Sequence, residues 1–181
     1  MATLASLASV AFGQAHAQTR DGLRPSAVFV QEGWAGDTRD ATVGAVWDWD
    51  ARWSAGGAEV TGYWEGSLSR WSYEALQAPQ TAWLAQLGLI PVFRFRPRDG
   101  WTGWFFDLGV GLTLTTRLYQ SDQRQFSTRF NFGDHLAVGR SFGADDRHEI
   151  ALRAEHFSNA GVRRPNPGIN FVQLRYSLRL D

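Results

Sequence analysis

The sequence predicts an all-β fold, namely an eight-stranded antiparallel transmembrane up-and-down β-barrel. Three observations support this prediction. The chain divides into segments of about ten residues in which apolar and polar side chains alternate, as they do in barrel strands. The 181 residues include nine Trp and twelve Phe, an aromatic content typical of β structure and of membrane interfaces. The N-terminal residues also resemble an export signal.

Eight alternating segments follow Pro25, and residues that favour turns separate them. The segments cover residues 26–35, 41–49, 59–71, 82–96, 103–115, 126–142, 148–158 and 170–180. Turns are predicted at Gly36-Asp37, at Gly56-Gly57, at 97–100 and at 143–146, and a longer loop is predicted at 160–169. An even number of strands allows the sheet to close on itself, which leaves no unpaired strand edge.

The fifth segment illustrates the alternation. One face carries Trp104, Phe106, Leu108, Val110, Leu112 and Leu114, and the other carries Phe105, Asp107, Gly109 and Gly111. A soluble sandwich or barrel would show the same pattern, because it too has one apolar and one polar face. The export signal and the strand lengths favour a membrane barrel. So do Trp residues near strand ends, where interfacial aromatic girdles lie: Trp34, Trp71, Trp83 and Trp101.

Charged residues on the polar faces are predicted to point into the barrel. They are Glu59, Glu65, Arg94, Asp107, Arg153 and Arg175. The lumen of an eight-stranded barrel is filled by side chains rather than open as a pore. We therefore expect these residues to form an ion-pair network with a structural role.

Length and composition limit the classes of function. The chain is long enough for one domain with a full core. Lys plus Arg and Asp plus Glu balance at 18 each, so no excess of positive charge indicates nucleic-acid binding. The sequence has no Cys, which excludes disulfides, thiolate catalysis and thiolate metal sites.

Residues 1–17 are small and apolar, and they end in Ala15-His16-Ala17. This A-x-A pattern precedes signal-peptide cleavage sites. The sequence therefore predicts a signal peptide at 1–17 and a single β-barrel domain at 18–181. No positively charged segment precedes the apolar stretch, which suggests an N-terminally truncated signal. The alternative is a disordered Ala-rich tail on a cytosolic protein.

The candidate catalytic residues lie at the end of the seventh segment, in His156-Phe157-Ser158-Asn159. A strand sends residues i and i+2 to the same face, so His156 and Ser158 lie side by side. Imidazole is the base best suited to activate a serine hydroxyl near neutral pH, and Asn159 offers a donor for an oxyanion. The spacing alone is weak evidence, because two polar residues at i and i+2 are also typical of any solvated strand face.

The strand register places this pair on the outer wall of the predicted barrel. His156 and Ser158 continue the apolar face of Ile150, Leu152 and Ala154, and Asn170 continues the outward face of the eighth segment. Unpaired polar groups are costly in an apolar medium. The register therefore favours a functional pair that acts on a lipid, and the alternative is a polar pair at the level of the lipid headgroups.

The residues around the pair resemble a known family. His156-Phe157-Ser158-Asn159-Ala160, followed by Pro165-Asn166-Pro167-Gly168-Ile169, is similar to the signature of the outer-membrane lipid A 3-O-deacylases, the PagL family. The resemblance implies an outer-membrane barrel that hydrolyses the ester-linked 3-O-acyl chain of lipid A in lipopolysaccharide, without a metal or other cofactor. It also implies a homodimer.

The resemblance implies a role for each site residue. Ser158 is the expected nucleophile and His156 the expected base, Asn159 contributes to the oxyanion hole, and Asn166 and Gly168 shape the site. The family usually has Glu where this chain has Asn170. An Asn can orient the imidazole but gives less electrostatic help to the imidazolium. Glu155 is no substitute, because a residue next to His156 points into the lumen.

The remaining candidates carry less information. Arg163 and Arg164 follow the motif and are expected either to bind lipid A phosphates or to be solvated loop charges. His135 and His148 have no further potential ligands at strand spacing, so no metal site is predicted. Two rival functions remain at this point: a non-catalytic structural or adhesive barrel, and a degenerate deacylase whose triad Asn170 has weakened.

Overall fold

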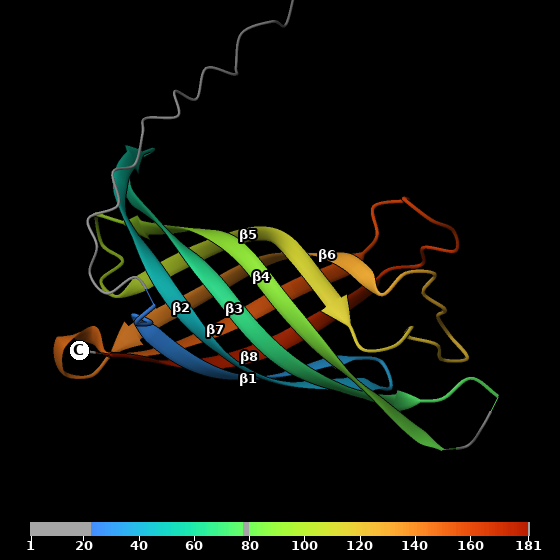
Figure 1. Cartoon of the computed structure of the whole chain (residues 1–181). Coiled ribbons are helices and arrows are strands. Elements are labelled where there is room, and N and C mark those ends of the chain that lie inside the picture. Colours follow the sequence, from blue (N-terminus) through green and yellow to red (C-terminus); the bar gives the residue numbers. More distant parts are fainter. Residues whose placement is uncertain (1–22, 78–79, 181) are drawn as a thin grey trace, which may run out of the picture.

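The computed structural model describes residues 23–77 and 80–180 and contains eight antiparallel strands that close into a barrel (Figure 1). The strands are β1 (Ala27–Ala35), β2 (Thr38–Ala55), β3 (Ala58–Glu74), β4 (Thr81–Pro97), β5 (Trp104–Thr115), β6 (Phe130–Phe142), β7 (His148–Ser158) and β8 (Ile169–Arg179). Each strand pairs with its neighbours in sequence, and β8 pairs with β1 to close the sheet. The up-and-down barrel is confirmed. The predicted signal peptide lies outside the described residues.

Two strand boundaries differ from the prediction by four residues or more. Strand β2 extends to Ala55 and forms a long hairpin with β3, visible on one side of Figure 1. Strand β6 begins at Phe130, four residues after the predicted start. Phe126 is instead buried against Tyr119, with ring centroids 5.3 Å apart, in the loop 116–129. This burial takes Phe126 out of the strand alternation.

The alternation divides outward-facing from lumen-facing side chains as expected. In β5 the exposed residues are Trp104, Phe106, Leu108, Val110, Leu112 and Leu114, and the alternating partners are buried. The same division holds in β7 and β8. An apolar outer band of this kind is what a barrel presents to a membrane. In the described part of the chain, no helix is long and apolar enough to cross a membrane.

The lumen contains two clusters of ion pairs. Glu65 accepts hydrogen bonds from Arg153 at 3.0 Å and from Arg175 at 2.6 Å. In the second cluster, Arg94 binds Asp107 at 2.8 Å and Glu149 at 2.7 Å. The predicted lumen network is therefore confirmed for five of its six members.

The prediction that the sixth residue, Glu59, points into the lumen is wrong. It pairs with Arg52 at 2.8 Å on the exposed β2–β3 hairpin. The reason is that this hairpin continues past the end of β1, where no lumen remains for Glu59 to face.

A cluster of aromatic and aliphatic side chains fills the end of the barrel that carries the loops 116–129 and 159–168. Its buried members are Trp71, Tyr73, Leu84, Tyr119, Phe126, Phe157, Ile169 and Phe171. The prediction that Trp71 belongs to an interfacial girdle is therefore wrong, because its side chain points inward and packs on Phe157 and Phe171. Trp34, Trp83 and Trp101 are exposed, as a girdle requires. The cluster gives the ends of β7 and β8 a rigid support.

Candidate active site

Strands β7 and β8 bring the predicted catalytic residues together on the outer wall of the barrel. His156 and Asn170 are direct partners in the β7–β8 register. Ser158 lies two positions beyond His156 on the same face, while Phe157 between them is buried in the aromatic cluster. The strand period and the burial of Phe157 therefore direct His156 and Ser158 toward the outside of the barrel.

The imidazole of His156 is held by Asn170. His156 Nδ1 lies 2.6 Å from Asn170 Oδ1. An amide oxygen can only accept a hydrogen bond, so Nδ1 carries the proton and donates it. The other ring nitrogen, Nε2, is then the unprotonated one and is available as a base. This is the tautomer that a serine nucleophile needs.

Ser158 is half-buried at the end of β7 and makes no hydrogen bond to His156 in this structure. Hydrogen bonds between catalytic residues are often long in the absence of substrate and tighten only in the complex. The two side chains lie at alternate positions of β7 and therefore on the same face of the strand.

Asn159 ties the residues after Ser158 to the neighbouring loop. Its side-chain amide nitrogen donates to Arg163 O at 2.8 Å, to Thr128 Oγ1 at 3.1 Å and to Ser127 Oγ at 3.2 Å. With these acceptors, the side-chain amide is not free to donate to an oxyanion. The backbone N–H of Asn159 donates to Asn166 Oδ1 at 2.9 Å. Asn166 therefore sits directly on the amide that follows Ser158.

Gly168 makes room for the imidazole. A Cβ at this position would lie 2.6 Å from His156 Cε1, and its φ of 61° is one that glycine adopts without strain. The carbonyl oxygen of Gly168 accepts a hydrogen bond from Arg124 Nη1 at 2.7 Å. Gly168 thus shapes the site by close approach, and the loop 116–129 holds it in place through Arg124.

Two residues next to the site, Arg124 and Asp134, were not predicted from the sequence. Arg124 lies in a segment where no strand period indicates its direction. Asp134 is the partner of His156 in the β6–β7 register and lies on the same outward row as His156 and Asn170. One of its carboxylate oxygens is buried without a hydrogen-bond partner among the described residues. A carboxylate on a lipid-facing stripe was a signal that the alternation of β6 could have provided.

The other candidates lie as follows. Glu155 is buried and accepts a hydrogen bond from Arg153 at 2.8 Å, which confirms the prediction that it points into the lumen. Arg163 and Arg164 are exposed in the loop 159–168. Within the described residues, no group of three or more His, Cys, Asp or Glu side chains is arranged to hold a metal ion.

Comparison with known proteins gives a consistent result. The family model for lipid A 3-O-deacylase (PagL) matches residues 40–179. The lipid A deacylase PagL of Pseudomonas aeruginosa is 29% identical over 179 residues, which cover 98% of this chain and 95% of that protein. The lipid A deacylase PagL of Bordetella bronchiseptica is 37% identical over 115 residues, or 62% of this chain and 59% of that protein.

The fold agrees as well. The crystal structure of the outer membrane enzyme PagL matches with a TM-score of 0.71 at 26% identity, over 85% of this chain and 99% of that one. The family match covers most of the barrel and both strands that carry His156, Ser158 and Asn170. This chain therefore belongs to the lipid A 3-O-deacylase (PagL) family.

Proposed function

We propose that this protein is an outer-membrane esterase that hydrolyses the ester-linked 3-O-acyl chain of lipid A by a Ser-His mechanism. The observation that carries the proposal is the His156–Asn170 hydrogen bond beside Ser158 on the apolar outer wall. A polar constellation in that position is costly unless it serves a function. A site that opens toward the bilayer reaches an acyl ester of a lipid without extracting the lipid from the membrane.

The proposed reaction begins when His156 Nε2 accepts the proton of Ser158 and the serine oxygen attacks the ester carbonyl. Asn170 accepts the Nδ1–H of the imidazole and keeps the ring in orientation. The protonated imidazole then donates its proton to the departing sugar oxygen, which leaves an acyl group on Ser158. Water, activated by the same base, releases the fatty acid and regenerates the serine.

We assign the stabilisation of the oxyanion to the backbone N–H of Asn159. The amide that follows the nucleophile is a common oxyanion donor in serine hydrolases. That N–H donates to Asn166 Oδ1 in the substrate-free structure, so an oxyanion would replace or share this acceptor. The exposed Arg163 and Arg164 are proposed to bind lipid A phosphates. Export through a signal peptide at 1–17 and a homodimeric state stay predictions.

Mass spectrometry of lipid A before and after expression tests the proposal, because it reports the substrate, the bond and the activity together. Loss of one 3-O-acyl chain is expected with the native sequence. Ser158→Ala and His156→Ala are each expected to abolish the loss while the barrel still folds. His148→Ala is the matched control, because His148 faces outward at the other end of the same strand. Full activity in either site variant would contradict the mechanism.

A further inference from the structure

We propose that the outer wall from β7, at Ile150, through β8, β1, β2 and β3 to β4 carries a second lipid site, which holds a lipid A molecule that is not undergoing hydrolysis. The proposal rests on the proposed function, because that function places lipid A in the leaflet around this end of the barrel. The site consists of an apolar hollow and a pair of arginines at its rim, and none of its residues belongs to the catalytic constellation.

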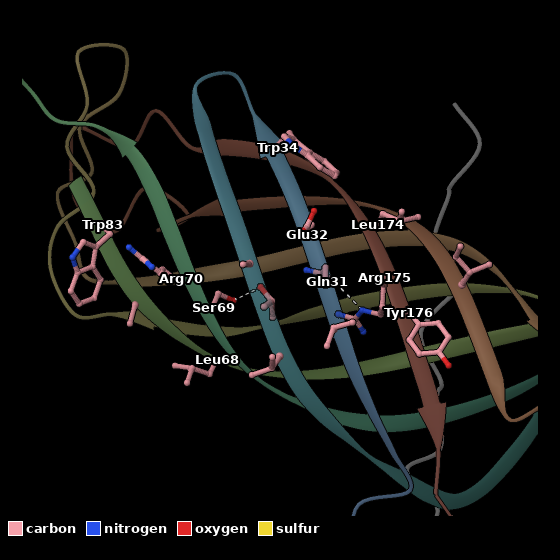
Figure 2. Close-up of a pocket in the computed structure, with 16 residues that line it drawn as sticks. Gln31, Glu32, Trp34, Leu68, Ser69, Arg70, Trp83, Leu174, Arg175 and Tyr176 are labelled. Atoms are coloured by element: carbon pink, nitrogen blue, oxygen red, sulfur yellow. Dashed lines mark hydrogen bonds between the residues drawn. The ribbon is translucent and has the colours of Figure 1, made fainter. Parts of the chain in front are cut away.

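The hollow has a volume of about 630 Å³ and lies between large outward side chains (Figure 2). Its apolar walls include Val30, Trp34, Val43, Leu68, Trp83 and Leu174. Small residues form its floor, because Ala41 and Ala85 stand where neighbouring rows carry bulky side chains. A recess of this size in an apolar wall fits one or more acyl chains.

Two guanidinium groups lie close to one aromatic ring, that of Trp83, which lines the hollow together with Arg70. Arg70 lies 5.5 Å and Arg117 lies 5.6 Å from the centroid of the exposed Trp83 ring. Figure 2 shows Arg70 beside Trp83 at the edge of the hollow. Neither arginine has a carboxylate partner in the part of the chain from 23 to 77 and from 80 to 180. Two unpaired guanidiniums held by a ring form a receptor for phosphate.

The opposite side of the hollow carries a carboxylate. Glu32, Ala41, Arg70 and Ala85 form one row across β1 to β4, so Glu32 and Arg70 face outward on either side of the small Ala41. Glu32 is exposed on the lipid-facing side of β1. It can accept hydrogen bonds from sugar hydroxyls while the arginines bind a phosphate. A phosphorylated glycolipid with acyl chains therefore matches the charges and the apolar walls together.

The lipid in the hollow is distinct from the reacting one. Strands β7 and β3 are four strand spacings apart around the wall through β8, β1 and β2, which is roughly 19 Å at the usual separation of neighbouring strands. Arg70 and Arg117 nevertheless lie toward the same end of the barrel as Ser158, because β3 and β5 both end there. They therefore meet the leaflet that supplies the substrate.

The stoichiometry of lipid binding tests the proposal. Full-length Ser158→Ala protein in detergent micelles is titrated with purified lipid A and analysed by native mass spectrometry. We expect two lipid A molecules per chain, and one after Arg70→Gln with Arg117→Gln, with the lost site weakened on the order of tenfold or more. The control pair, Arg52→Gln with Arg98→Gln, lies at the other end of the barrel and should keep two. Ala41→Trp fills the hollow, leaves both arginines in place, and should also give one.

Several results would overturn the second site. One is that the variant with Arg70→Gln and Arg117→Gln binds as many lipid A molecules per chain as the Arg52/Arg98 control. Another is a fall in kcat when the two arginine changes are made with Ser158 intact, because that would place the reacting lipid in the hollow. A third is Arg70- and Arg117-dependent binding of phosphatidylglycerol but not of lipid A. Failure of the proposed function would look different, since Ser158→Ala would then leave hydrolysis unchanged.

Discussion

His156 Nδ1 and Asn170 Oδ1 are joined by a 2.6 Å hydrogen bond between directly paired residues of β7 and β8. The bond fixes the ring and its tautomer, which are the geometric tasks of the third member of a triad. It supplies no negative charge to stabilise the imidazolium that forms during attack. Asn170 can therefore orient the imidazole, whereas electrostatic stabilisation of the imidazolium has to come from neighbouring groups.

Replacing Asn170 with Glu should raise kcat for deacylation by about tenfold or more, because a carboxylate in the same position stabilises the imidazolium. Rates of fatty-acid release from lipid A, measured at saturating substrate, check this. Asn170→Gln is the matched control, since it has the length of Glu but no charge. If Asn170→Glu showed no gain over the native protein, the missing charge would not limit the rate.

Asp134 is the nearest outward carboxylate in the row that contains His156 and Asn170. We expect Asp134→Asn to lower kcat by about tenfold when Asn170 is present, because the imidazolium then loses the charge of its cross-strand neighbour. The loss should be smaller in the Asn170→Glu background, where a second carboxylate is available. Rates of the four combinations give the coupling between the two positions. Equal losses in both backgrounds would mean that Asp134 acts on the fold alone.

Gly168→Ala should lower activity by about tenfold or more, because the new Cβ would meet His156 Cε1 at 2.6 Å and displace the ring. Gly161→Ala provides the control. Gly161 also has a positive φ, of 79°, but a Cβ there would meet nothing within 4 Å. Both variants should lose about 1–2 kcal/mol of stability from the backbone strain, and only Gly168→Ala should lose kcat. Equal activities in a deacylation assay would contradict the proposed contact.

The strand period predicted the features of the site that depend on local order. It gave the outward direction of His156, Ser158 and Asn170 and the inward direction of Glu155, because in a regular strand each side chain's face follows from its position. The same reasoning failed for Trp71. Its position near a strand end suggested a girdle, but its parity along β3 sends it into the barrel.

Contacts between segments that are distant in sequence could not be predicted in the same way. Asp134 lies beside His156 only because of the β6–β7 register, which depends on the length of the connecting turn. Phe126 and Arg124 lie in the loop 116–129, which has no strand periodicity. Phe126 is positioned by packing in the aromatic cluster, and Arg124 by its hydrogen bond to the carbonyl oxygen of Gly168. These positions follow from tertiary packing, for which a single sequence carries no periodic signal.

Glu65 provides a test of the lumen that is separate from catalysis. It is 1% exposed and binds both Arg153 and Arg175. Glu65→Gln should destabilise the barrel by about 3–5 kcal/mol, because it removes the carboxylate that the buried Arg175 binds and leaves Arg153 paired with Glu155. Urea unfolding in detergent measures the change.

Glu59→Gln is the control, since its pair with Arg52 is exposed and should contribute at most about 1 kcal/mol. If the two variants unfolded at the same urea concentration, the buried cluster would not stabilise the barrel. Below its unfolding transition, Glu65→Gln should retain its deacylation rate, because Ser158 and His156 face the other side of the wall.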